Sequence, residues 1–183
     1  MKTDTPATHA HLALQKLAGK YLTFQLGRES YGIPVLKVRE IIRLVPITAV
    51  PQTLCFIKGV INLRGKIIPV LDLRLRFGLS STGDTESTCI VVVQVKRSSD
   101  SQVQMGLIVD AVEEVCLISA ADIEESPDFG KAVETEYILG MAKLKGLVKI
   151  LLDIERVVGC DTQLPTDPPP APAPHPSSNV AIG

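Results

Sequence analysis

The sequence predicts a mostly β protein built from two copies of one structural unit. The chain is 45% hydrophobic but only 4% aromatic and has no Trp. Its Val, Ile and Leu residues come in short runs, which are typical of buried strands. One stretch also recurs later in the chain without a gap, which indicates an internal duplication. At 183 residues the chain is long enough to bury a sizeable core.

The first predicted element is a β-hairpin. Leu22, Phe24 and Leu26 alternate with the residues between them, which is the two-residue period of a strand. The turn Gly27-Arg28-Glu29-Ser30 leads into a second strand that begins at Tyr31. Further strands are expected over the apolar runs at 41–45, 59–63, 66–71, 89–95, 102–109, 112–118, 140–144 and 147–152.

The recurring stretch runs from position 59 to 78 and matches 140–159 position by position. Its identical pairs are Gly59 with Gly140, Leu63 with Leu144, Gly65 with Gly146, Leu71 with Leu152, Asp72 with Asp153, and Gly78 with Gly159; Arg64 faces Lys145. Several of these residues set backbone shape. Gly65 and Gly146 suit tight turns that need a positive φ, and Asp72 and Asp153 suit the N-cap of a short helix.

A second match supports the duplication, because Tyr31–Ile41 aligns with Met105–Val115, again without a gap. Each half-chain has about sixty residues, too few to be comfortably stable alone, so we expect the halves to share a hydrophobic interface. The sequence predicts a body over 20–159, with one subdomain at about 20–80 and the other at about 86–159.

Both termini differ in composition from the body. Residues 1–19 are expected to form a flexible segment with one short amphipathic helical turn around Leu12, Leu14 and Leu17. Residues 160–183 hold seven of the thirteen prolines and few bulky apolar side chains, which predicts a disordered tail with polyproline II bias. A solvated tail and a docking segment both fit, and the lack of flanking aromatic or basic residues favours the former.

Charge and hydropathy exclude several classes of partner. Nineteen basic and twenty acidic residues give a net charge of -1, which provides no field for a polyanion, so nucleic acid is not expected as a partner. No apolar stretch reaches the roughly 18 residues of a membrane span. The N-terminus also lacks a secretory pattern, so we expect a cytoplasmic protein without direct membrane insertion.

Residues that usually carry catalysis are missing from the predicted body. His9, His11 and His175 all fall in the terminal segments, and the four cysteines stand singly, without metal-ligand spacing. No glycine-rich phosphate loop is present. Capping explains Asp72 and Asp153 more simply than acid–base chemistry does. We therefore expect no enzymatic activity, no cofactor and no metal site.

Two stretches then identify a family. The sequence YGIPVLKVREI at 31–41 and the sequence IKGVINLRGKIIPVLDLR at 57–74 closely resemble the CheW family of chemotaxis coupling proteins. The resemblance resumes at 106–110, 135–140 and 153–155 and covers about Lys20 to Gly159. It implies two SH3-like five-stranded β-barrels that lie side by side with short helices, in agreement with the duplication.

The resemblance also implies a function and two protein partners. The chain would be an adaptor at membrane receptor arrays, binding the cytoplasmic hairpin tip of methyl-accepting chemoreceptors and the regulatory domain of a CheA-type histidine kinase. By motif position, the receptor-facing residues are Val38, Glu40, Gly59, Asn62 and Arg64, with Cys89 and Ile90 at the opening strand of the second barrel. The kinase-facing residues stay unassigned, apart from the outer strands of the first barrel as a region.

Simpler roles remain open for three of these residues. Arg64 could be the exposed neighbour of a turn glycine, Glu40 a solvated strand position, and Val38 a core residue. Two other functions also remain open: an adaptor of the same fold in a motility or second-messenger array, and a small-molecule sensor or enzyme that uses the groove between the barrels. Cys89 stands where the family usually carries a larger aliphatic residue, which puts the detailed shape of the groove in question.

Overall fold

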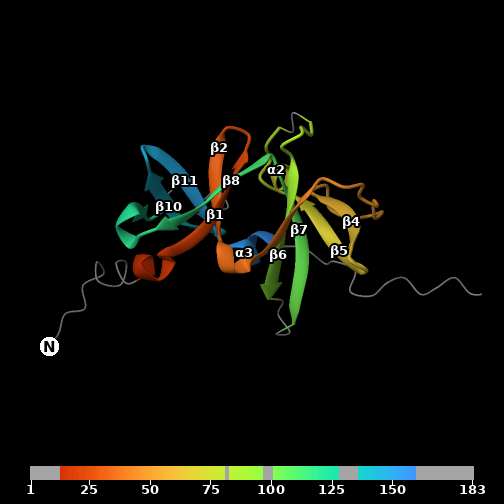
Figure 1. The fold of residues 1–183 in the computed structure, drawn as a ribbon, viewed down its shortest axis with the longest axis horizontal. Helices are drawn as coiled ribbons and strands as arrows, with labels where there is room; N and C mark the ends of the chain where they lie inside the picture. Colours follow the sequence, from red (N-terminus) through yellow and green to blue (C-terminus); the bar gives the residue numbers. More distant parts are fainter. Residues whose placement is uncertain (1–12, 81–82, 97–100, 128–135, 160–183) are drawn as a thin grey trace, which may run out of the picture.

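The computed structural model describes residues 13–80, 83–96, 101–127 and 136–159. Within these ranges the strands form two sheets that lie side by side (Figure 1). Sheet A, the basis of barrel A, has the strand order β8-β1-β2-β11-β10-β9, and sheet B, the basis of barrel B, has the order β3-β6-β7-β5-β4. The prediction of a mostly β protein with two barrel subdomains and short helices is confirmed, but sheet A has six strands instead of the predicted five, because the short β9 adds to its edge.

The bounds of most strands follow the predicted runs, but the strand predicted at 41–45 lies at Val38–Arg43, and Ile123–Glu124 was not predicted. Sheet A contains β1 (Gly19–Leu26), β2 (Glu29–Pro34), β8 (Ala111–Ile118), β9 (Ile123–Glu124), β10 (Ile138–Leu144) and β11 (Leu147–Leu152). Sheet B contains β3 (Val38–Arg43), β4 (Ile57–Leu63), β5 (Lys66–Asp72), β6 (Cys89–Lys96) and β7 (Gln102–Val109). The short helices are η1 (Val35–Lys37), α2 (Leu73–Arg76), η2 (Ala120–Asp122) and α3 (Ile154–Gly159).

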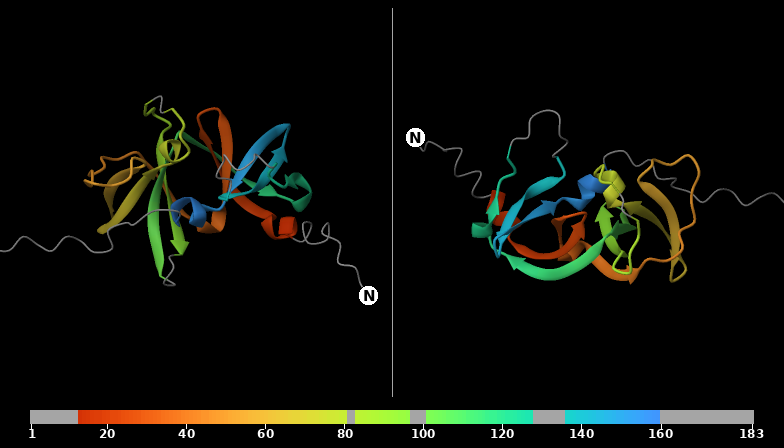
Figure 2. Two further views of the ribbon diagram at one scale, coloured as in Figure 1. Left: turned by 180° about the vertical axis from the view of Figure 1, so that it is seen from behind. Right: turned by 90° about the horizontal axis from the view of Figure 1, so that it is seen from above.

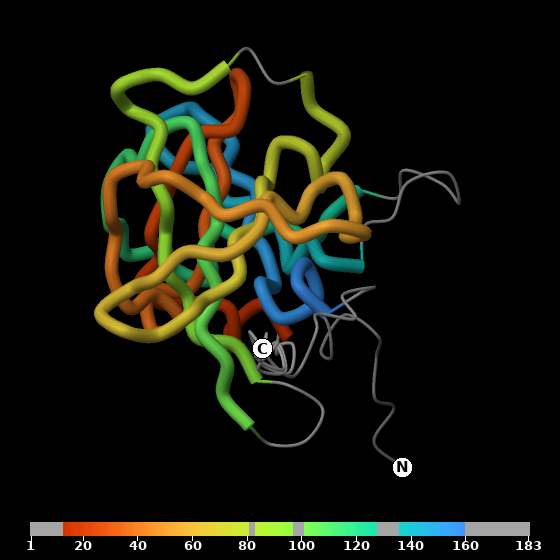
Figure 3. The backbone as a smooth tube through the Cα atoms, turned by 90° about the vertical axis from the view of Figure 1, so that its right-hand side faces the viewer, coloured from red at the N-terminus to blue at the C-terminus, as the bar shows by residue number. Residues whose placement is uncertain are grey.

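The barrels do not follow the predicted division of the chain between positions 80 and 86. Strands β1 and β2 belong to barrel A with β8 to β11, whereas β6 and β7 belong to barrel B with β3 to β5. Each half of the chain therefore gives its first two strands to the barrel formed mainly by the other half. Strand β2, near the start of the described chain, accordingly pairs with β11, near its end, in barrel A, where red and blue segments lie side by side (Figure 3).

The exchange is symmetric down to single residues. Strands β5 and β7 pair in parallel with Val70 opposite Gly106, and β11 pairs with β2 in parallel with Leu151 opposite Gly32. The two internal matches of the sequence make these pairs equivalent, since they align Val70 with Leu151 and Gly32 with Gly106. Space for a side chain is limited at both places: a Cβ at Gly106 would lie 2.8 Å from Ile90 Cγ2, so Ile90 would have to move, and one at Gly32 would lie 3.1 Å from Leu151 Cδ2, which is a tight contact.

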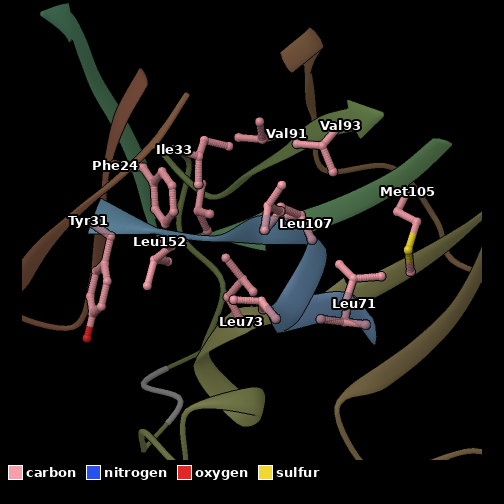
Figure 4. Packing of buried hydrophobic residues seen from close by; sticks show 14 of the residues in the cluster. Phe24, Tyr31, Ile33, Leu71, Leu73, Val91, Val93, Met105, Leu107 and Leu152 are labelled. Atoms are coloured by element: carbon pink, nitrogen blue, oxygen red, sulfur yellow. The ribbon is translucent and has the colours of Figure 1, made fainter. Parts of the chain in front are cut away.

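A shared core joins the barrels, as predicted. Side chains from both sheets pack into one cluster, where Phe24, Ile33 and Leu152 of barrel A meet Leu71 and Leu107 of barrel B (Figure 4). Four stacked aromatic rings extend this core: Phe24, Tyr31, Phe77 and Tyr137, with successive centroids 6.2, 5.7 and 5.1 Å apart. This continuous apolar contact fixes the barrels against each other. The ribbon views of Figure 2 show the two barrels side by side from behind and from above.

Each barrel also has an interior of its own. The interior of barrel B is apolar and contains Ile61, Ile68, Val70, Ile90, Val92 and Ile108. In barrel A, Lys149 is only 5% exposed and its Nζ lies 2.6 Å from Glu113 Oε2. Burial alone would raise the pKa of Glu113, but hydrogen bonds from Lys149 and Ser30 lower it below its usual value. The duplicated interiors have thus diverged in polarity.

The predicted turn and cap residues are confirmed. Arg64 and Gly65 have φ values of 50° and 82°, and Lys145 and Gly146 have φ values of 51° and 80°, so both hairpins use turns with two positive φ angles. The Asp72 carboxylate accepts a hydrogen bond from the Arg74 backbone N–H. The Asp153 carboxylate accepts one from the Glu155 backbone N–H. Both carboxylates therefore cap a short helix, as predicted.

The N-terminal prediction is correct in part. Residues 13–17 are helical, and Leu14 and Leu17 pack against the interior of barrel A, so the ordered body begins earlier than Lys20. Residues 1–12 and 160–183 lie outside the described residues. The expectations for the three histidines, for Cys160 and for the proline-rich tail therefore stay predictions.

Candidate functional site

A charged pair on barrel B is the first feature of the candidate site. The guanidinium of Arg64 donates two hydrogen bonds to the Glu40 carboxylate, at 3.2 Å to Oε1 and 2.8 Å to Oε2. Arg64 lies in the β4–β5 turn and Glu40 on strand β3, at the opposite edge of sheet B. The bidentate geometry orients both side chains, although the Arg64 side chain is 79% exposed. We call this arrangement the Glu40–Arg64 clamp.

Barrel A has no equivalent clamp among the described residues. Lys145 and Glu114 occupy the corresponding positions, and neither forms an ion pair there. Instead, Lys143, which corresponds to Asn62, lies 2.6 Å from Glu124. The two turns therefore have the same backbone conformation, but among the described residues a charged clamp is found on barrel B and not on barrel A.

Asn62 and Gly59 determine the backbone conformation around the site. The Asn62 side-chain carbonyl accepts a hydrogen bond of 2.9 Å from the Gly65 backbone N–H and so braces the turn that carries Arg64. Gly59 has a φ of 137°, and a Cβ there would lie 2.0 Å from the backbone oxygen of Thr48. Thr48 and Val60 exchange two backbone hydrogen bonds of 2.9 Å, so the bare glycine allows this segment to lie against β4.

Replacing Gly59 with Ala is expected to destabilise the protein by about 2–4 kcal/mol, because backbone atoms of Thr48 must move and the φ is unfavourable for other residues. Chemical denaturation would measure this change in the free energy of unfolding. Gly65→Ala is the control: Gly65 also has a positive φ, but a Cβ there would have no atom within 4 Å, so a loss of about 1 kcal/mol is expected. Equal losses in the two variants would contradict the steric explanation.

Val38 and Cys89 lie at the junction of the barrels. Both are partly exposed and pack against the shared core. Burial raises the pKa of the Cys89 thiol. A hydrogen bond with the Val112 backbone lowers this pKa in part, so the thiol lies beside strand β8. Val38 therefore packs against the core and is also partly exposed. The receptor-facing role and the core role expected for it are thus compatible.

The prediction for Ile90 is wrong for its side chain. Ile90 is completely buried in the interior of barrel B, because neighbouring residues on a strand point to opposite faces and Cys89 takes the outward position. Strand β6, which carries both residues, also belongs to barrel B and does not open a separate C-terminal barrel.

The junction contains apolar residues that the sequence analysis did not select. Val112 packs against the shared core from β8, and Ile41 and Val115 are 46% and 53% exposed on β3 and β8. The second internal match pairs Val38 with Val112 and Ile41 with Val115. This signal was present in the sequence, but it could not show that Val38 and Val112 pack against one shared core.

A buried arginine at the junction was also missed. The Arg74 guanidinium lies 2.8 Å from Asp72, 2.9 Å from Asp84 and 3.1 Å from Asp110. Asp110 in turn accepts a hydrogen bond of 2.7 Å from the Gly27 backbone N–H in barrel A. Hydrogen bonding to Asp72 is the main cause that raises the pKa of Arg74. This network links the two barrels and is structural.

Two further observations concern other kinds of site. Within the described ranges, no group of three or more His, Cys, Asp and Glu side chains is arranged to hold a metal ion. In the same ranges, no helix has the length and apolar character needed to cross a membrane.

Comparison with known proteins decides the family. The model of the CheW-like domain matches residues 20–160 of the chain. The chain belongs to the CheW family. It is 37% identical over 155 residues to the chemotaxis protein CheW of Klebsiella aerogenes, which covers 85% of this chain and 90% of that relative. It is 31% identical over 140 residues to the CheW of Treponema pallidum, covering 74% and 79%.

A solved structure of a CheW protein has the same fold. The crystal structure of the scaffolding protein TtCheW from Thermoanaerobacter tengcongensis superposes with a TM-score of 0.68 at 37% sequence identity. The match covers 76% of this chain and 92% of that chain. The exchanged double barrel of this CheW-family chain therefore agrees with the family resemblance found in its sequence.

Proposed function

We propose that this chain is a non-catalytic adaptor that couples methyl-accepting chemoreceptors to a chemotaxis histidine kinase in a two-component signalling array. The observation that carries the proposal is the Glu40–Arg64 clamp beside an apolar junction, in a chain similar to chemotaxis and scaffolding proteins over most of its length. Such an adaptor works in the cytoplasm and reaches the membrane through its partners.

The receptor hairpin binds at the junction and against the clamp. Val38 and Cys89 supply apolar contact from barrel B, and Val112 supplies it from barrel A. Exposed apolar side chains beside an oriented charged pair suit a helical partner that buries one apolar face. Asn62 and Gly59 support this surface by shaping its backbone, and Ile90 supports it from the core.

The kinase regulatory domain binds a second surface on barrel A. Leu147 and Val148 at the start of β11 are 63% and 48% exposed, which is unusual for two successive apolar side chains on a hairpin. The equivalent positions of barrel B, Lys66 and Ile67, closely follow Arg64 and so adjoin the receptor surface. Separate surfaces allow both partners to bind at the same time.

Replacing Arg64 with Ala is expected to weaken receptor binding by about tenfold or more, because an oriented arginine at an interface commonly contributes more than about 1.4 kcal/mol. Titrating a receptor cytoplasmic hairpin and a kinase regulatory domain from the same organism, each against wild type and variant, would measure this change. Glu40→Ala should have a similar effect, since it releases the Arg64 side chain from its orientation.

Lys145→Ala provides the matched control, because it alters the equivalent turn of barrel A, which has no clamp among the described residues. It should leave the receptor affinity within about twofold of wild type. Leu147→Glu should weaken kinase binding while receptor binding is retained. A wild-type chain that bound neither partner would refute the adaptor function, and equal losses for Arg64→Ala and Lys145→Ala would refute the placement of the receptor surface.

A further inference from the structure

A groove on barrel A, lined in part by the η1 segment that precedes Val38, is not used by the proposed function. It has a volume of about 380 Å³ and lies between the first helical turn with the start of β1 and the η1 segment. Its lining is mainly apolar, from Leu17, Tyr21, Val35, Leu36 and Leu139. Leu36 is 88% exposed, the highest value among the exposed large hydrophobic residues of the described chain. An exposed leucine at the rim of an apolar groove gives a surface that another segment can cover.

The charge of the groove restricts what can cover it. Lys16 and Lys20 line it, and its lining contains no carboxylate side chain from the described residues. Neither lysine forms an ion pair within the described part of the chain. An occupant with apolar residues, acidic residues and no cationic side chains is therefore complementary to this groove.

The chain itself contains a segment of this composition. Residues 160–183 include seven prolines and Leu164, and their only charged side chains apart from His175 are Asp161 and Asp167. Proline has a restricted backbone, so a proline-rich segment loses less conformational entropy when it binds than an ordinary segment does. Proline-rich segments commonly dock in apolar grooves with aromatic side chains in their lining. Tyr21 is the aromatic residue in this lining, although it is only 3% exposed and its hydroxyl donates a hydrogen bond to the Leu17 carbonyl.

The end of helix α3 places this segment within reach. Lys37, directly after the groove residue Leu36, forms an ion pair of 2.6 Å with Glu155 of α3. Gly159 ends α3 one helical turn later, which is about 6 Å along the helix axis. Residues 160–168 can span about 30 Å when extended, which is enough to bring the first consecutive prolines to the groove. The connection also gives the segment an effective concentration in the millimolar range.

We propose that the proline-rich segment 160–183 docks intramolecularly in the groove between Leu17, Lys20 and Leu36. This inference concerns a surface separate from the two partner surfaces and stands independently of them. It replaces the expectation of a plain solvated tail with that of a docking segment.

Two-dimensional ¹H–¹⁵N NMR spectra of the full chain and of a chain ending at Gly159 test the proposal without any partner. We expect the amide signals of Gly19, Lys20, Val35 and Leu36 to differ between the two chains. A synthetic peptide of residues 160–183, added to the shortened chain, should move the same signals toward their positions in the full chain. Raising the salt concentration should weaken the peptide's binding, because Lys16 and Lys20 face its two aspartates.

Leu36→Glu, which alters an exposed side chain and should leave the fold intact, is expected to weaken binding of the peptide about tenfold. Leu54→Glu is the matched control, because Leu54 is also exposed, at 43%, but lies outside the groove, and it should have no effect. Identical spectra of the two chains, or differences outside the groove, would overturn the proposal. Differences that disappear on dilution would also overturn it, since they would mean that the segment binds a second copy.

Discussion

Residues 1–85 and 86–183, expressed as separate chains, are expected to remain unfolded. Strands β1 and β2 in the first fragment pair with β8 and β11 in the second, and β6 and β7 in the second pair with β3 and β5 in the first. Each fragment alone contains only some of the strands of each barrel, so strand edges would stay unpaired and the shared core would be exposed. Circular dichroism and NMR spectra of each fragment would show the absence of folded structure.

Mixing the two fragments should restore the fold, because together they contain every strand of both barrels. The mixture should therefore give the dispersed NMR spectrum of the intact chain, with a transition midpoint that depends on concentration. A fragment 1–85 that unfolded cooperatively by itself would contradict this expectation. Such a result would mean that the first half can form a barrel without exchanging strands.

Replacing Arg74 with Met is expected to destabilise the protein by about 3–5 kcal/mol, because it leaves the buried Asp72 carboxylate without its partner. It also removes the contact through which Asp110 links Arg74 to the Gly27 turn of barrel A. Urea denaturation of wild type and variant would measure the loss. The Asp72→Asn change added to Arg74→Met should recover part of it, since that change removes the uncompensated charge.

Arg156→Met serves as the control for this experiment. Arg156 lies 3.5 Å from Asp153, but its side chain is 61% exposed, so the loss should be under about 1 kcal/mol. If Arg74→Met were no more destabilising than Arg156→Met, the buried network would contribute little to holding the barrels together.

The sequence by itself determined the features that depend on neighbouring residues and on repetition. Alternating apolar residues identified the strands, and the glycines and aspartates that recur between 59–78 and 140–159 identified the turns and caps. The motifs at 31–41 and 57–74 identified the family and, with it, Glu40 and Arg64. Such features follow from local backbone preferences, which a sequence displays directly.

Only the tertiary structure decided which strands share a barrel and which site residues reach the surface. The duplication suggested two sequential barrels, but pairing between strands far apart in the chain, such as β1 and β8, exchanged their first two strands. That exchange buries Ile90, leaves Cys89 at the junction beside Val112, and surrounds Arg74 with three carboxylates. Local patterns cannot specify these contacts, because strand alternation sets which residues share a face but not which strand or barrel that face meets.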